Sequence, residues 1–206
     1  MLSPDERNRA SRFHFERDSQ RFTVARASMR AILAAYTNAP AGELRFKLYA
    51  KDKPALEPLS DIRFNISHSG DMALLGIAFR REVGVDIEAI RTNVEIENLA
   101  ERFFSPHERE TIRSLPEQDK VAAFFRCWSC KEAFLKAQGV GLSRSLNSFD
   151  VEVNPARPGR LIATRPDANE TERWCLHTME TVQGYAAAVS AEGAISEMKI
   201  MRCRQM

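Results

Sequence analysis

The sequence has no apolar run long enough to span a bilayer, few cysteines and almost no net charge. A membrane-spanning helix needs about 18 consecutive apolar residues, and the N-terminus is polar rather than signal-like. We therefore predict a cytoplasmic protein with no membrane contact. Four cysteines are too few for a secreted disulfide framework, so reduced thiols are expected. A net charge of +2 argues against a nucleic-acid partner.

The pattern of apolar residues predicts helices and then strands, twice in succession. Helices are expected over 3–37 (broken near Asp18 and Ser19), 94–104, 106–115 and 117–138, and strands over 44–48, 64–67, 72–79, 83–88, 149–153, 161–163, 174–179 and 185–190. The strands from 64 to 88 are predicted to form an antiparallel meander, with residues 67–71 as its first turn. This order indicates an α+β fold with two halves of comparable plan.

The segment Gly84–Glu88 places two carboxylates on one face of a predicted strand. Side chains alternate along a strand, so Asp86 and Glu88 share one face while Val85 and Ile87 enter the core. Paired carboxylates repel each other unless a cation lies between them, and hard oxygen ligands suit Mg²⁺ together with phosphates. The alternative is an exposed acidic edge.

The helix predicted over 117–138 carries a glutamate within its apolar stripe. At 3.6 residues per turn, Glu132 falls on the same side as Phe124, Trp128 and Leu135. A buried carboxylate needs a metal or a basic partner, and Lys136 or Lys131 could supply the positive charge. If Asp86, Glu88 and Glu132 meet, they form an all-oxygen site suited to phosphoryl transfer.

Two further segments each allow two interpretations. The residues from Asn65 to Gly70 are either an ordinary turn or one whose amides and hydroxyls bind a phosphate, with His68 as a donor. Glu108 follows Ser105 and Pro106 at the spacing of a capping box, so it is either a helix cap or a functional carboxylate.

Taken together, four motifs resemble those of the Sfp-type 4′-phosphopantetheinyl transferases. They are FNISHSG at 64–70, GVDIE at 84–88, FFSPHE at 103–108 and WSCKEAFLK at 128–136, and the similarity covers nearly the whole chain. The resemblance implies a monomer of two pseudo-symmetric halves, 1–83 and 84–206, with coenzyme A in the cleft between them. The family usually begins with a strand before its first helix, so either one sheet edge is missing here or the start site is misassigned, and reduced stability of that half is expected.

The resemblance also implies the reaction and the residues that perform it. The phosphopantetheine of coenzyme A would move to a serine of an apo acyl or peptidyl carrier protein, which docks near Phe103 and Phe104. The metal, Mg²⁺ with Mn²⁺ as an alternative, would be held by Asp86, Glu88 and Glu132. The implied catalytic residues are Glu132, Lys136 and Glu108, and the implied coenzyme A ligands are Arg17 (with Arg9), Lys53, Ser67, His68 and Lys131.

Three alternatives remain at the level of the sequence. Cys127 and Cys130 have the spacing of a thioredoxin-type redox motif, although they fall within a predicted helix rather than at its start. The same three carboxylates could serve a Mg²⁺-dependent nuclease. A carrier-binding protein without activity could also keep the fold.

Overall fold

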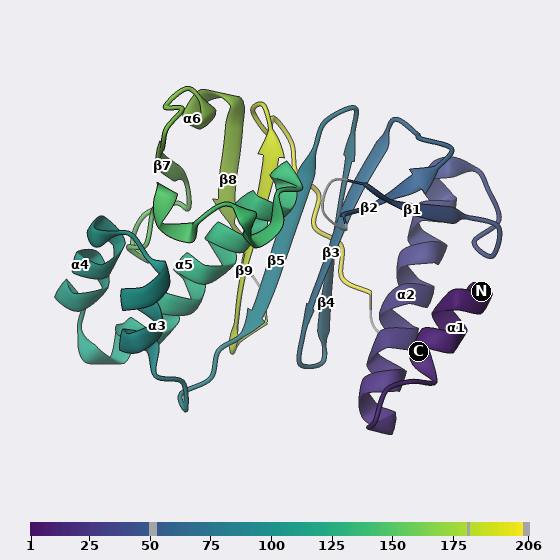
Figure 1. Cartoon of the computed structure of the whole chain (residues 1–206), viewed down its shortest axis with the longest axis horizontal. Helices are drawn as coiled ribbons and strands as arrows, with labels where there is room; N and C mark the ends of the chain where they lie inside the picture. Colours follow the sequence, from purple (N-terminus) through teal and green to yellow (C-terminus); the bar gives the residue numbers. More distant parts are fainter. Residues whose placement is uncertain (50–52, 181, 204–206) are drawn as a thin grey trace.

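The computed structural model describes residues 1–49, 53–180 and 182–203. Two long helices each pack against antiparallel strands, and the strands of the two parts meet in the middle of the molecule (Figure 1). The two helices, α2 (Glu16–Thr37) and α5 (Glu117–Gln138), have 22 residues each. The predicted α+β fold with two halves of comparable plan is confirmed.

The N-terminal part begins with α1 (Pro4–Ala10), and a capping box is present between Ser3 and Glu6. The helix break lies earlier than predicted, because α2 starts directly after Phe15. Ser19 therefore does not cap a helix. Its hydroxyl donates a 2.7 Å hydrogen bond to the carbonyl of Ala10, which has no partner within a helix that ends there.

Two antiparallel strand pairs complete this part: β1 (Arg45–Tyr49) with β2 (Lys53–Glu57), and β3 (Ile62–Ser69) with β4 (Met72–Phe79). The strand β2 was not predicted from the sequence. One face of α2 covers these strands through a separate small core, which consists of Met29, Leu33, Leu44, Leu56 and Phe64.

The turn between β3 and β4 is shorter than predicted. Ser67, His68 and Ser69 pair in register with β4, so only Gly70 and Asp71 remain between the strands. Gly70 has a φ of 56°, a conformation that two-residue hairpin turns favour. The predicted turn over 67–71 is therefore too long, because the backbone of its first three residues belongs to a β-ladder.

The C-terminal part surrounds α5, which packs on a three-stranded antiparallel sheet of order β5-β9-β8. Most of its other elements lie around the same helix and share its core (Figure 1). The bounds are β5 (Val83–Ala89), α3 (Ile96–Phe103), α4 (Pro106–Ser114), η1 (Gly141–Ser143), η2 (Leu146–Ser148), β6 (Phe149–Val151), β7 (Leu161–Thr164), α6 (Glu170–Arg173), β8 (Trp174–Thr178) and β9 (Tyr185–Glu192). Among the described residues, no helix has both the length and the apolar character needed to cross a membrane.

The predicted meander ends at β4. The next strand, β5, pairs with β9, whose residues come about a hundred positions later. The strands β3 and β5 lie side by side in the middle of the molecule (Figure 1), yet they belong to different sheets. Strands that are adjacent in the sequence usually pair with each other, but β5 pairs with the distant β9 and not with β4.

Candidate active site

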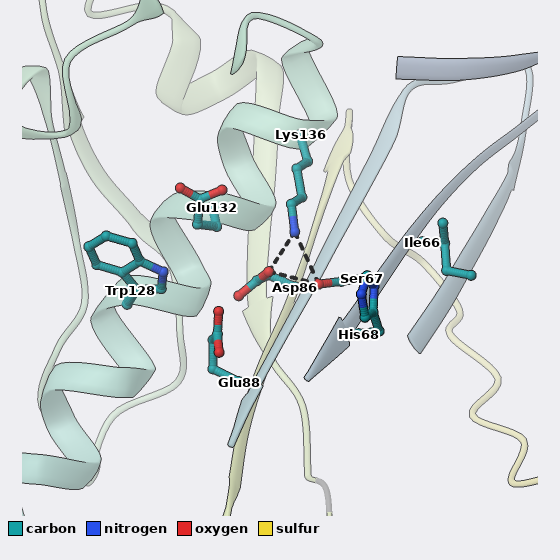
Figure 2. Close-up of a pocket in the computed structure, with 8 residues that line it drawn as sticks. All are labelled: Ile66, Ser67, His68, Asp86, Glu88, Trp128, Glu132 and Lys136. Carbon is teal, nitrogen blue, oxygen red and sulfur yellow. Dashed lines mark hydrogen bonds and ion pairs between the residues drawn. The ribbon is translucent and has the colours of Figure 1, made fainter. Parts of the chain in front are cut away.

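A cavity of about 400 Å³ opens where β3, β5 and α5 meet. Figure 2 shows the side chains that line it: Ile66, Ser67, His68, Asp86, Glu88, Trp128, Glu132 and Lys136. Six of these eight residues were singled out from the sequence, and the fold brings them to one place from three separate elements. The two others, Ile66 and Trp128, were not.

Strand β5 aims its two acidic side chains into this cavity. Val85 and Ile87 are 2% exposed and occupy the core side, so the alternation predicted from the sequence is present. Asp86 is also only 2% exposed. Its Oδ1 accepts hydrogen bonds from Ser67 Oγ at 2.9 Å and Lys136 Nζ at 2.6 Å. Its Oδ2 is buried without a hydrogen-bond partner, which makes this atom a candidate ligand.

Helix α5 contributes a carboxylate and an amine that lie one turn apart. Glu132 and Lys136 occupy the same side of the helix and face the cavity (Figure 2). Burial raises the pKa of Glu132; the charge of Lys136 opposes this shift, and Asp86 and Glu88 add to it. Lys136 Nζ also donates to Ser67 Oγ at 3.0 Å.

Glu88 has a hydroxyl partner of its own. Ser69 Oγ donates to Glu88 Oε2 at 3.0 Å. Burial raises the pKa of Glu88 and the neighbouring charge of Asp86 raises it further, while the bond from Ser69 lowers it. The cavity thus combines three carboxylates with one lysine, and this excess of negative charge favours a bound cation.

The close approach of β5 to α5 depends on Gly84. A Cβ atom at this position would lie 2.1 Å from the backbone N of Ala137 and 2.2 Å from the carbonyl O of Ala133. Both alanines are fully buried. Strand and helix backbones therefore nearly touch, and this contact sets the separation across which Lys136 reaches Asp86.

The chemistry of the donors fits a divalent cation that prefers oxygen ligands. Three carboxylates from two elements line the cavity, and one buried oxygen of Asp86 lacks a partner. Within the described part of the chain, no three acidic, histidine or cysteine side chains already meet in a preassembled metal centre. Like charges keep such carboxylates apart unless a cation lies between them, and Lys136 neutralises Asp86 here.

His68 and Trp128 lie on opposite sides of the carboxylates (Figure 2). His68 is exposed on β3, whereas Trp128 is half-buried on α5. The sequence placed Trp128 only in the apolar stripe of the helix. The signal that could have placed it in the site is its spacing, because Trp128, Glu132 and Lys136 follow one another at four-residue intervals on one side of α5.

Lys53 does not line this cavity. Its Nζ donates to Glu82 Oε2 at 2.7 Å and to the carbonyl O of Ala137 at 2.9 Å, while Arg63 binds the other Glu82 oxygen at 3.1 Å. Burial lowers the pKa of Lys53, and the contact with Glu82 acts against this shift. Lys53 thus connects β2 to the end of α5, a role not predicted from the sequence.

The predicted ligands of the 3′-phosphate also lie outside the cavity. Arg17 is exposed at the start of α2, with its Nε 3.9 Å from Asp18 Oδ1. The guanidinium of Arg9 lies 5.3 Å from the ring centroid of Phe22. Neither arginine contacts the carboxylates.

Glu108 and Lys131, predicted as site residues, lie in the protein interior instead. Both are fully buried, and Lys131 Nζ lies 2.8 Å from Glu108 Oε1. Lys131 also donates to the carbonyls of Leu146 and Phe149, each at 2.7 Å. Glu108 completes the capping box of α4, so the helix-cap interpretation is confirmed. Their burial is the physical reason that neither side chain reaches the cavity.

The redox alternative is wrong. Cys127 and Cys130 lie in the middle of α5 and are fully buried. Burial raises the pKa of Cys127 well above its usual value and raises that of Cys130 to about 12. A redox-active thiol needs access and a lowered pKa, and both conditions are absent at these two residues.

The chain matches two family models along most of its length. One, described as the 4′-phosphopantetheinyl transferase N-terminal family, matches residues 1–79, and the 4′-phosphopantetheinyl transferase superfamily matches residues 82–190. The 4′-phosphopantetheinyl transferase HetI of Nostoc sp. is 38% identical, covering 93% of this chain and 79% of the relative. Sfp of Bacillus subtilis is 30% identical, covering 93% and 82%. A solved holo-[acyl-carrier-protein] synthase of Thermotoga maritima covers 54% of this chain and 62% of its own, at 22% identity and a TM-score of 0.42.

Three carboxylates and a lysine around one cavity suit an enzyme that acts on a phosphate group with the help of a divalent cation. This chain belongs to the 4′-phosphopantetheinyl transferase superfamily, because the family model covers more than half of it and the relatives share at least 30% identity over most of their length. The enzyme class predicted from the four motifs is confirmed, and the matches do not favour the nuclease alternative.

Proposed function

We propose that this protein transfers the 4′-phosphopantetheine group of coenzyme A to a serine hydroxyl of an apo acyl or peptidyl carrier protein. The observation that carries the proposal is the meeting of three carboxylates and one lysine at a cavity where a buried oxygen of Asp86 has no partner. Such a site suits a diphosphate neutralised by a cation.

Asp86, Glu88 and Glu132 are the residues that would hold Mg²⁺, with Mn²⁺ as an alternative. A metal bound there would neutralise the phosphate oxygens on which charge develops. This assignment is supported by the oxygen-only donor set and by its excess of negative charge.

The remaining chemistry falls to the protein's own side chains. Glu132 accepts the proton of the carrier serine, whose oxygen forms a bond to the β-phosphorus of coenzyme A as the bond to the leaving 3′,5′-ADP breaks. Lys136, which already balances the charge of Asp86, stabilises the transferring phosphate. Positioning and charge neutralisation supply most of the catalysis.

We place coenzyme A between the halves 1–83 and 84–206. Ser67 and His68 line the cavity and would contact the diphosphate. Lys53 would have to release Glu82 to reach a phosphate, and Arg17 would meet the 3′-phosphate farther from the carboxylates. Each of these assignments follows the family pattern.

The carrier protein would dock beside α3, on the side of the cavity formed by Trp128. Of the two phenylalanines expected at this surface, Phe103 is half-buried and available, whereas Phe104 is 2% exposed and packs against Phe124. The docking surface therefore includes Phe103 but not Phe104. We further propose that the protein is cytoplasmic and that it is a monomer. Light scattering would test the oligomeric state.

The proposal is tested by mass spectrometry of apo carrier proteins incubated with the protein, coenzyme A and Mg²⁺. The wild type is expected to add one phosphopantetheine, and Glu132→Gln to add none at the same time points. Glu117→Gln is the matched control, because it makes the same chemical change at an exposed position of the same helix. It should keep the wild-type rate.

Two results would contradict the proposal. No mass gain on fatty-acid, polyketide or peptide-synthetase carriers would indicate a carrier-binding protein without activity. Full activity in Glu132→Gln would show that this carboxylate neither binds the metal nor accepts the proton.

A further inference from the structure

On the edge of β5 that faces β3, the backbone N–H groups are hydrogen-bonded by side chains instead of by a neighbouring strand. On its other edge β5 pairs with β9 through the backbone. On the edge facing β3, three backbone N–H groups donate to side chains of β3 at every second position: Val85 to Asn65 Oδ1 at 2.9 Å, Ile87 to Ser67 Oγ at 3.4 Å and Ala89 to Ser69 Oγ at 3.0 Å.

These hydrogen bonds satisfy backbone N–H groups that are buried at the boundary between two sheets. A strand edge presents N–H groups that are costly to bury without an acceptor. The backbones of β3 and β5 are not paired, so side-chain oxygens of β3 stand where carbonyl groups would stand within one sheet. Asn65 and Ser67, both 6% exposed, show that this boundary is largely closed to water.

The two serines in this row have a second contact that the asparagine lacks. Ser67 Oγ donates to Asp86 at 2.9 Å, and Ser69 Oγ donates to Glu88 at 3.0 Å. In each case the hydroxyl accepts from the N–H of the residue that directly follows the carboxylate. The same arrangement therefore occurs twice, two residues apart, at both acidic positions of β5.

We propose that Asn65, Ser67 and Ser69 form a side-chain ladder that joins the two sheets, and that Ser69 is the positioning residue for Glu88. The second part rests on the proposed function, in which Glu88 is a metal ligand. Ser69 donates to one oxygen, Oε2, of the Glu88 carboxylate and thereby restricts its rotation. The backbone amide that donates to Ser69 fixes the hydroxyl in turn.

Asn65 supplies an internal control, because it accepts the same kind of bond from β5 without a hydrogen bond to an acidic side chain among the described residues. The residue before the donor Val85 is Gly84, whereas a carboxylate precedes each of the two donors that bind the serines. Changes at Asn65 and Ser69 should therefore weaken the same boundary, while only those at Ser69 should disturb the acidic site.

Two measurements on the full-length protein test the proposal. Mn²⁺ binding is titrated by the loss of the paramagnetic resonance signal of the free ion, and amide hydrogen exchange is followed by NMR. Ser69→Ala should weaken Mn²⁺ binding about tenfold and speed exchange at Ala89. Ser69→Thr, which keeps the hydroxyl, should restore both. Asn65→Ala should speed exchange at Val85 and leave the Mn²⁺ affinity unchanged.

Each outcome separates this inference from the proposed function. Wild-type Mn²⁺ affinity in Ser69→Ala would overturn the positioning role while the metal site stands. A wild type that binds no Mn²⁺ would overturn the metal site and the positioning role with it. Unchanged exchange at Val85 and Ala89 in the two variants would overturn the ladder. Ser69→Cys, a similar volume with a weaker donor, replaces Ser69→Ala if that variant does not fold, with the same expected loss.

Discussion

Helix α5 carries two lysines that pair with carboxylates in opposite ways. Lys131 is fully buried, and its Nζ has three partners: Glu108 and the carbonyls of Leu146 and Phe149. The side chain of Lys136 is 30% exposed at the cavity. Its partner Asp86 keeps one buried oxygen without a hydrogen bond.

The difference distinguishes an ion pair that stabilises the fold from one that is placed to act in the reaction. All three donors of Lys131 are used, so the pair with Glu108 has no capacity for a ligand. The Lys136–Asp86 pair borders a cavity and two further carboxylates, and incompletely satisfied charged groups in a cleft are typical of functional sites.

The strongest test of this comparison is Lys131→Met. Its loss leaves the Glu108 carboxylate buried without a counter-charge, which we expect to lower the free energy of unfolding by about 3–5 kcal/mol. Urea unfolding followed by circular dichroism measures the change. Lys120→Met, on the same helix, is the control: Lys120 pairs with the exposed Glu117, so its loss should cost about 1 kcal/mol or less.

A double variant identifies the cause of that loss. Lys131→Met combined with Glu108→Gln removes the buried charge but keeps a residue that can close the capping box. Part of the stability should return. A double variant no more stable than Lys131→Met alone would mean that the lysine acts through packing rather than charge.

Lys136→Met should have the opposite profile. We expect kcat to fall about 10²–10³-fold, as for the loss of one group that stabilises transition-state charge. The stability should fall by less than in Lys131→Met, because Lys136 is partly exposed at the cavity and Asp86 keeps its hydrogen bond from Ser67. Carrier modification rates and urea unfolding give the two values. A loss of stability equal to that of Lys131→Met would remove the distinction between the two pairs.

Gly84→Ala should disturb the site through the backbone. A Cβ there would overlap Ala137 and Ala133, forcing β5 away from α5 at a cost of about 1–3 kcal/mol. Activity should fall as well, because the same shift separates Lys136 from Asp86. Gly42→Ala is the matched control, since its Cβ would meet no atom within 4 Å. Equal effects of the two substitutions would argue against a special contact at Gly84.

Acid unfolding tests another satisfied buried carboxylate, Glu6. Burial by itself would raise the pKa of Glu6, but the N–H of Ser3 and the guanidinium groups of Arg30 and Arg26 hold it below its usual value of 4.5. The resulting stability is complete above pH 4.5 and is lost as the pH falls through the lower folded-state pKa.

Glu6→Gln should therefore lower the free energy of unfolding at pH 7 by about 1–2 kcal/mol. It should also flatten the loss of stability below pH 4.5. Urea unfolding from pH 7 to pH 3 compares the two proteins. Parallel curves over this range would show that Glu6 is not held in its charged form.

The smallest effect is expected for the cysteines of α5. Cys127 and Cys130 are buried and have raised pKa values, so neither should react with a thiol reagent in the folded protein. Cys203 is exposed and should react quickly, without loss of carrier modification. Rapid labelling of either α5 cysteine, detected by peptide mass spectrometry, would contradict the buried environment of this helix.

Local patterns predicted the elements better than their partners. The span of α5 was correct at both ends, because its apolar stripe is regular and Gly139 stops the helix in a left-handed conformation. The strand β5 was predicted, but its pairing with β9 was not, because the alternation within one strand carries no information about which distant strand it pairs with. The strand β2 was not predicted, because a proline and charged residues interrupt the alternation of apolar and polar side chains in this segment.

The sequence by itself determined which residues could carry the chemistry and which motifs they form. Alternation along 83–88 and helical spacing along 117–138 placed Asp86, Glu88, Glu132 and Lys136 on usable faces. Only the tertiary structure decided that Lys136 rather than Lys131 faces the cavity, that Glu108 caps a helix, and that the serines of β3 hold the carboxylates. The physical reason is that these outcomes depend on burial and on contacts between distant segments, which no local period encodes.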